Sequence, residues 1–284
     1  MTIMANFRRR VPGRDPRTRP KVTVPEMLAG AVVLFLVVAV AFPALLAPYN
    51  PLAIYPPDAF QGPSLEHWFG TDESGRDIYS RVVFGARPSL LIGVAATAIG
   101  VGLALALGSL AGLGGRALDF GVGRLLEVLF ALPGLLLALV FIAIAGPGVL
   151  TSTVAVGLST APGYARIIRG QIIQVRGSGM VEAAVVLGRT RWQVVRRHLL
   201  PNALSPVFVI ATLGLGQAVV WAASLSFLGL GEPPPAAEWG AMLAAGRTYL
   251  TTAWWMTFFP GLFIVFTAAG STVLGRGLQR RMAR

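Results

Sequence analysis

Residues 128–165 read VLFALPGLLLALVFIAIAGPGVLTSTVAVGLSTAPGYA, a run of 38 residues without one Asp, Glu, Lys or Arg. A helix that crosses a bilayer needs roughly 20 mainly apolar residues, so this run is long enough for nearly two crossings. Gly146, Pro147 and Gly148 interrupt it and leave 18 residues before the break and 17 after it. Glycine and proline punctuate helical patterns, so the run predicts two membrane spans with a short connection between them.

Four further charge-free runs occur along the chain, each of them at least 28 residues long. Only 13% of the residues are charged, against about 25% in a typical soluble domain. Each run is long enough for one span, so the sequence predicts an all-α polytopic membrane protein with six transmembrane helices. The four runs are Met27–Pro57, Pro88–Gly115, His198–Gly231 and Thr248–Gly275.

The composition excludes several kinds of chemistry. The chain has no cysteine, and its two histidines, His67 and His198, lie far apart in the sequence, so we expect no disulfide and no metal site. The only lysine, Lys21, follows Pro20 rather than a glycine-rich loop, so the sequence lacks the pattern of a nucleotide-binding P-loop. We therefore expect no cofactor in this chain, and any ATP and Mg²⁺ would be bound by partner subunits.

The net charge of +12 is distributed unevenly along the chain. If the N-terminus is cytoplasmic, 20 of the 24 basic residues fall in cytoplasmic segments, and seven of the 12 acidic residues fall outside. Such an asymmetry follows the positive-inside rule. It predicts that both termini are cytoplasmic, and it explains the basic charge without a nucleic-acid partner.

The spans and charges divide the chain into segments. The residues between the first two spans hold prolines, aromatic residues and most of the external charge, so we expect this loop to be folded. Within the core we expect a third span over about residues 126–145 with a kink at Pro133. The predicted segments are a disordered basic cytoplasmic tail (1–26), a first span (27–47), an external loop (48–88), a core of five helices (89–275) that includes a cytoplasmic segment (166–204), and a second basic tail (276–284).

The second span carries a stripe of small residues. Gly100, Ala104, Gly108 and Gly112 recur at intervals of four, which places them on one face of a helix. Small residues let the backbones of two membrane helices approach closely. The stripe therefore predicts a tightly packed helix pair.

The predicted spans contain no acidic or basic residue at depth, since Glu127 lies at a membrane boundary. Proton and ion pathways usually depend on such groups at depth, so their absence from the spans disfavours a proton- or sodium-driven carrier, a membrane protease and a metal enzyme. What remains is a passive pathway or one that an external motor opens. The polar groups within the spans are hydroxyls and amides, such as Ser109, Ser159, Thr160, Gln217, Ser224 and Ser226.

Segment 166–204 differs from the rest of the chain because it holds seven arginines and one acid, Glu182. Trp192, Val195 and Leu199 have the spacing of one apolar helix face, and we expect Pro201 to end that helix. Such a helix could coat anionic lipid. Glu182-Ala183-Ala184 and Gly188 are better suited to close approach in a protein groove, which favours docking to a partner.

This segment resembles a motif of the membrane-embedded permease subunits of bacterial ABC importers. The motif consists of Glu-Ala-Ala, three residues, Gly, nine residues, a hydrophobic residue, any residue and Leu-Pro. Here its residues are Glu182, Ala183, Ala184, Gly188, Leu200 and Pro201, with His198 at the hydrophobic position.

Further stretches resemble the peptide/nickel type of permease, and within it the second (C-type) subunit of dipeptide and oligopeptide importers. The chain departs from this type where Arg276, rather than an acid, follows Leu274-Gly275. The similar stretches are HWFGTDESGRD (67–77), GARPSL (85–90), PGYAR (162–166), RGQ (169–171), SFLGLG (226–231), PPP (233–235), EWGAM (238–242) and FPG (259–261).

The resemblance implies a type I permease architecture in the bacterial inner membrane. It implies a homologous second permease, one or two cytoplasmic ATPase subunits that dock on the Glu182–Pro201 motif, and an extracytoplasmic binding protein that delivers di- or oligopeptides. Nickel or another small solute is the first alternative substrate. A secondary carrier or channel, and a purely structural scaffold, remain as alternatives from other classes. The sequence identifies no substrate-binding residue.

Overall fold

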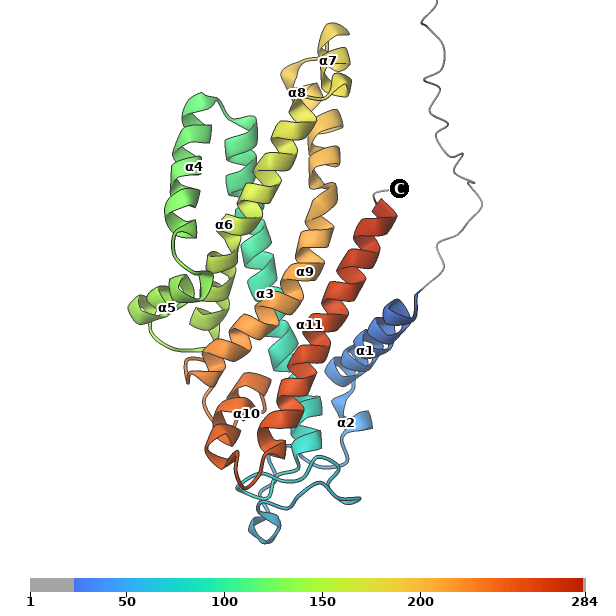
Figure 1. Ribbon diagram of the computed structural model, residues 1–284, viewed down its shortest axis with the longest axis vertical. Coiled ribbons are helices and arrows are strands. Elements are labelled where there is room, and N and C mark those ends of the chain that lie inside the picture. Colours follow the sequence, from blue (N-terminus) through green and yellow to red (C-terminus); the bar gives the residue numbers. More distant parts are fainter. Residues whose placement is uncertain (1–22, 283–284) are drawn as a thin grey trace, which may run out of the picture.

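The computed structural model of the protein describes residues 23–282 (Figure 1). For residues 204–206 and 282 it describes the backbone alone. This part of the chain is almost entirely helical and forms no β-strand. The predicted tail 1–26 lies outside the described residues up to position 22, and the predicted tail 276–284 is helical as far as Met282.

The first helix, α1 (Val24–Ala41), is shifted from the predicted span 27–47. Glu26 accepts a hydrogen bond from the Thr23 N–H (3.1 Å) and caps the first turn, so it belongs to the helix rather than to a tail. The helix ends at Phe42, and Pro43, whose ring suits a first helical position, opens the short helix α2 (Pro43–Leu46).

Helix α3 (Ile78–Leu113) begins earlier than expected, because residues 78–88 are helical rather than part of the external loop. Asp77 caps its first turn, since the carboxylate accepts a hydrogen bond from Ser80 N (2.7 Å). Pro88 lies inside the helix without ending it. The loop before α3 therefore spans residues 48–77 and is called loop 48–77 below.

The stripe of small residues on α3 packs against α6 (Val149–Arg176), as predicted. A Cβ atom on Gly108 would lie 2.8 Å from the backbone oxygen of Ala165, and one on Gly112 would lie 2.7 Å from Ile172. Real Cβ contacts are longer than this, so only glycine allows the two backbones to lie so close. The two helices run side by side through the centre of the molecule (Figure 1).

The third span differs most from the prediction. Residues 126–145 do not form one kinked helix, because α4 (Arg116–Phe130) and α5 (Gly134–Ala145) meet at 90°. Proline disfavours a helical conformation in the residue before it, and the chain leaves the helix ahead of Pro133. With 12 residues, α5 is about 18 Å long, shorter than a bilayer core. It lies across the axis of the bundle (Figure 1).

By length and composition, four helices within the described residues can cross a membrane, or five if the bent pair counts as one. Helix α6 is 28 residues long but carries arginines near one end, and it extends beyond the predicted fourth span, 149–164. The count of six spans thus remains a prediction. The four candidates are α1, α3, the part of α9 from Val207 to Phe227, and α11 from Trp255 to Arg281.

The remaining helices occupy the two ends of the bundle. Helices α7 (Gly179–Val186) and α8 (Arg191–Val194) form one end, and α10 (Trp239–Gly246) lies near loop 48–77 at the other (Figure 1). Helix α9 (Leu200–Phe227) connects the two ends, and α11 (Trp255–Met282) packs along it.

Pro201 does not end a helix as expected, but lies in the first turn of α9. A wide turn over Val195–Leu199 joins α8 to α9, and in it the Leu200 N–H donates to the oxygen of Val195, five residues back. Proline has no N–H to donate. We infer that the wider turn accommodates the missing donor without a break.

Candidate functional site

The predicted docking motif forms a compact unit at one end of the bundle. Val181 and Ala184 of α7 are buried against Val194 and Leu199. Glu182 and Ala183 are exposed beside them. Ala184 therefore holds α7 in place, whereas Glu182 and Ala183 are available to a partner.

Gly188 closes α7 in a conformation that favours glycine. Its φ of +75° is in the left-handed region, and its N–H donates to Val185 O (2.9 Å). The next N–H, of Arg189, donates to Ala184 O (3.1 Å), so the pair forms a Schellman cap. Apart from its two chain neighbours, no described residue has an atom within 4 Å of the place where a Cβ would be. Within this chain the glycine thus serves a tight turn and not a close approach.

The apolar surface of this unit differs from the one expected. Leu199 is buried, but Trp192 is 68% exposed, and Val194 takes its place in the cluster. Val186 and Leu187, which the sequence reasoning missed, are 86% and 79% exposed. Exposed apolar residues in a group indicate a surface that binds something. The apolar docking surface, defined here as Met180, Val185, Val186, Leu187 and Trp192, surrounds Glu182 on α7 and continues onto α8.

Glu182 makes no ion pair within 4.0 Å with any residue that the structure describes. Leu200 and Pro201 lie in the first turn of α9, where they shape the entry into that helix. The residues of the motif therefore lie in two places. Glu182 and Ala183 are exposed on α7, and Leu200 and Pro201 form the start of α9.

Loop 48–77 is folded by hydrogen bonds and ion pairs, as expected. The Asp77 carboxylate caps α3 and lies 3.0 Å from His67 Nδ1. Desolvation, together with nearby carboxylates, raises the pKa of Tyr49. Its hydroxyl donates to Glu66 O (3.3 Å). His67 is 5% exposed. Its role is thus to hold the loop on the start of α3.

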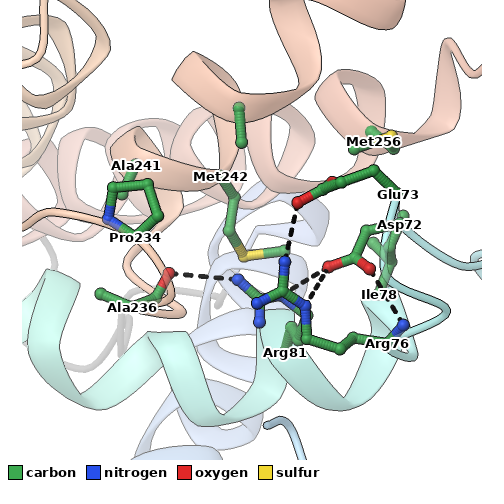
Figure 2. A pocket seen from close by; sticks show the side chains of 11 residues that line it. Asp72, Glu73, Arg76, Ile78, Arg81, Pro234, Ala236, Ala241, Met242 and Met256 are labelled. Atoms are coloured by element: carbon green, nitrogen blue, oxygen red, sulfur yellow. Dashed lines mark hydrogen bonds and ion pairs between the residues drawn. The ribbon is translucent and has the colours of Figure 1, made fainter. Parts of the chain in front are cut away.

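Figure 2 shows a second cluster, in which two buried arginines from the start of α3 and the turn before it meet acids of the loop. Arg76 Nε donates to Asp72 Oδ2 (2.6 Å) and its Nη2 to Glu73 Oε1 (2.8 Å). Arg81 donates to the backbone oxygens of Pro51, Pro235 and Ala236, which belong to two loops distant from it in the sequence. A cavity of about 60 Å³ lies beside them. Buried charges of this kind require partners, and here the pairing joins loop 48–77 to the loop before α10.

Glu238 completes this polar end of the bundle. It is 2% exposed, and its carboxylate accepts hydrogen bonds from Gly240 N and Ala241 N (2.8 Å each), which caps α10. Ser89 of α3 donates to the same carboxylate (3.3 Å). The indole of the fully buried Trp239 donates to Val82 O (2.9 Å). The sequence singled out this stretch by resemblance, and the structure gives it a packing role.

The structure is a bundle of apolar helices with a folded polar loop at one end and a group of exposed apolar residues at the other. The chain matches the family described as binding-protein-dependent transport system inner membrane component over residues 104–284. It belongs to this family, the multi-pass inner-membrane permeases of ABC importers, which work with an ATPase and a binding protein and do not hydrolyse ATP themselves.

Curated relatives cover most of the chain. The probable D,D-dipeptide transport system permease protein DdpC of Escherichia coli (strain K12) is 39% identical over 88% of this chain and 84% of its own length. The dipeptide transport system permease protein DppC of Alkalihalophilus pseudofirmus is 37% identical over 89% and 83%. The glutathione transport system permease protein GsiD of Shigella flexneri serotype 5b is 40% identical over 89% and 84%.

Solved structures agree on the fold. A chain of the inward-facing MetNI methionine ABC transporter aligns with a TM-score of 0.59 at 21% identity, over 72% of this chain and 97% of its own. A chain of an amino acid ABC transporter aligns with a TM-score of 0.57 at 19% identity, over 70% and 94%. The predicted type I permease architecture is thereby confirmed.

Proposed function

We propose that the solutes this permease carries are di- or oligopeptides. The observation that carries the proposal is the set of relatives at 37–40% identity, which are named for the transport of dipeptides, D,D-dipeptides and glutathione. All three solute classes contain amide-linked amino acids. The charge-free spans agree with this, because a solute without a fixed net charge needs no buried counter-ion.

We further propose that the importer has one or two kinds of ATPase subunit and that one such subunit docks on this chain at Glu182, Ala183, Ala184 and Gly188, with Leu200 and Pro201 shaping the connection to α9. The exposed apolar docking surface supports this, since apolar groups at the core of an interface supply much of its stability. ATP and Mg²⁺ are bound by those subunits. A homologous second permease completes the membrane part of the importer, and a binding protein delivers the peptide at the opposite end, where loop 48–77 lies.

This proposal puts both termini in the cytoplasm. The arginine-rich segment and the basic residues of α11 then meet the anionic cytoplasmic leaflet, as the positive-inside rule requires. Loop 48–77 and α10 face the other side of the membrane.

The test is transport in proteoliposomes that contain this chain, the second permease, the ATPases and the binding protein. We expect ATP-dependent accumulation of a labelled dipeptide and none when either the ATPases or this chain is omitted. Uptake of Ni²⁺ without peptide uptake would favour the alternative substrate. Uptake by this chain alone, driven by an ion gradient, would favour a secondary carrier.

A further inference from the structure

The middle of α9 carries an exposed amide. Gln217 lies near the centre of the span Val207–Phe227, and its side chain is exposed, whereas the neighbouring Ala218 and Val219 are buried. A polar group that faces lipid at this depth lacks hydrogen-bond partners and costs several kcal/mol. The position of Gln217 therefore indicates a water-filled space or a partner rather than lipid.

A cavity of about 310 Å³ lies beside this amide. It is bounded by the break between α4 and α5, by the middle of α6 and by α9, and its lining includes Pro133, Pro162, Tyr164, Gln217 and Trp221. The Tyr164 hydroxyl donates to Gln217 Oε1 (3.3 Å). A side chain on Gly134 would collide with Trp221, at 2.3 Å from the ring. The cavity thus owes its shape to the bent α4–α5 pair, which the sequence did not predict.

Among the amide and hydroxyl groups of Ser159, Thr160 and Gln217 that line this cavity, only the Gln217 amide has donors without a partner in the described part of the chain. The hydroxyls of Ser159 and Thr160 donate to carbonyl oxygens of their own helix, at 2.9 and 3.0 Å. The Gln217 side-chain nitrogen, in contrast, donates to no residue that the structure describes. An amide has two donors on that nitrogen, so both are available to a solute.

A second cavity lies nearby, between α4 and α6. Phe130 lines the cavity beside Gln217, and the Arg166 guanidinium lies over its ring at 4.5 Å. Arg166 in turn lines the second, larger cavity of about 650 Å³, next to an ion pair in which Arg169 Nη2 donates to Asp119 Oδ2 (2.9 Å). Charged groups of this density require water. The cavity between α4 and α6 is therefore lined mostly by charged residues, whereas the cavity beside Gln217 is lined by uncharged ones.

We propose that Gln217 and Tyr164 line the translocation pathway and hydrogen-bond to the backbone peptide group of the solute in transit. This proposal rests on the proposed function. A peptide group offers one C=O and one N–H, which the donors of Gln217 and the hydroxyl of Tyr164 can meet. Both contacts are made to the backbone of the solute, so they do not select among its side chains. Because they are uncharged they are also weak, which lets the solute leave again, as conduction requires.

Solvent access tests this placement. In the assembled importer, with both permeases, the ATPases and the binding protein, Gln217→Cys should react with a charged thiol reagent, and a dipeptide with ATP present should slow that reaction. The chain has no other cysteine. Leu34→Cys, at a 65% exposed apolar position of α1, is the matched control and should stay unreactive. An unreactive Gln217→Cys would mean that the second permease covers this face, which overturns the proposal.

Transport provides the second readout. Gln217→Leu keeps the approximate size but removes the donors, so we expect dipeptide transport to fall about fivefold, as for the loss of one uncharged hydrogen bond. Co-purification of the ATPases should be unchanged, and Gln217→Asn should retain more transport than Gln217→Leu. If the leucine variant does not assemble, the labelling result decides.

The two proposals fail in different ways. If the wild-type importer carries no peptide but another solute, the proposed function is wrong. If it carries peptide while Gln217→Leu transports at the wild-type rate and Gln217→Cys is unreactive, the pathway assignment alone is wrong.

Discussion

Gly188 allows a backbone conformation to be tested separately from a contact. Its φ of +75° costs an L residue other than Asn or Asp about 1–2 kcal/mol, whereas an added Cβ would meet nothing within 4 Å among residues 23–282 beyond its chain neighbours. Replacing glycine by alanine also stabilises through the unfolded chain by about 0.4–1 kcal/mol. The net loss for Gly188→Ala is therefore about 1 kcal/mol, which lowers the equilibrium constant for closing the turn about fivefold.

The assay has two parts. Hydrogen exchange should show faster exchange of the amides at 188 and 189 in Gly188→Ala, because these amides close the cap by donating to Val185 O and Ala184 O. Retention of the ATPases during purification, and peptide-stimulated ATP hydrolysis, should fall in parallel. Gly188→Asn should lie between wild type and alanine, since asparagine tolerates the left-handed region, and Gly188→Val should be worse than alanine.

Two results would contradict this reasoning. Equal damage by asparagine and alanine would mean that an ATPase atom approaches Gly188 closely, so that bulk rather than φ matters. Wild-type exchange and hydrolysis in all three variants would remove the motif from coupling altogether and would leave the lipid-coating alternative.

Three further predictions concern packing and orientation. Gly85→Ala should destabilise the chain by about 1–3 kcal/mol, because its Cβ would lie 2.0 Å from a backbone oxygen of the loop before α10. The control Gly102→Ala should not destabilise it, because no described residue outside its own stretch of helix lies within 4 Å of that Cβ. Thermal unfolding in detergent measures both variants. Glu238→Ala should cost about 2 kcal/mol in the same assay, since three hydrogen bonds to a buried carboxylate are lost. Leu65→Cys, at a 99% exposed position, should react with an impermeant reagent on intact cells, and Val186→Cys should react only after permeabilisation; the reverse pattern would invert the proposed topology.

The parts of the fold that the sequence predicted are those set by one physical rule acting locally. Charge-free runs are long enough to span a bilayer by composition alone, and the small residues from Gly100 to Gly112 pack closely because only their size matters. For Gly188 the sequence indicated close approach in a protein groove, and the left-handed cap that it forms is a finding of the structure.

The errors arose where a local rule had two outcomes that only tertiary structure distinguishes. Pro133 allows either a kink or a full break, and the packing of Gly134 on Trp221 accompanies a 90° break. Pro201 could end a helix or begin one, and the wide turn before it allows the second. Trp192 had the spacing of a packed face but is exposed, and no periodicity distinguishes a core face from a docking face.

The connectivity relates the proposed pathway to the docking surface. Helix α6 leads from Tyr164 directly to the arginine-rich segment, and α9 leads from that segment directly to Gln217. At 1.5 Å per residue, Tyr164 lies about 18 Å from the end of α6 at Arg176, and Gln217 lies about 26 Å from the start of α9 at Leu200. The hydrogen bond between Tyr164 and Gln217 thus joins the two helices that flank α7 and α8. A displacement of α7 and α8 that turns α6 relative to α9 must change the distance between these two side chains. If both proposals hold, docking at one end and solute contact in the middle are therefore coupled through these two helices.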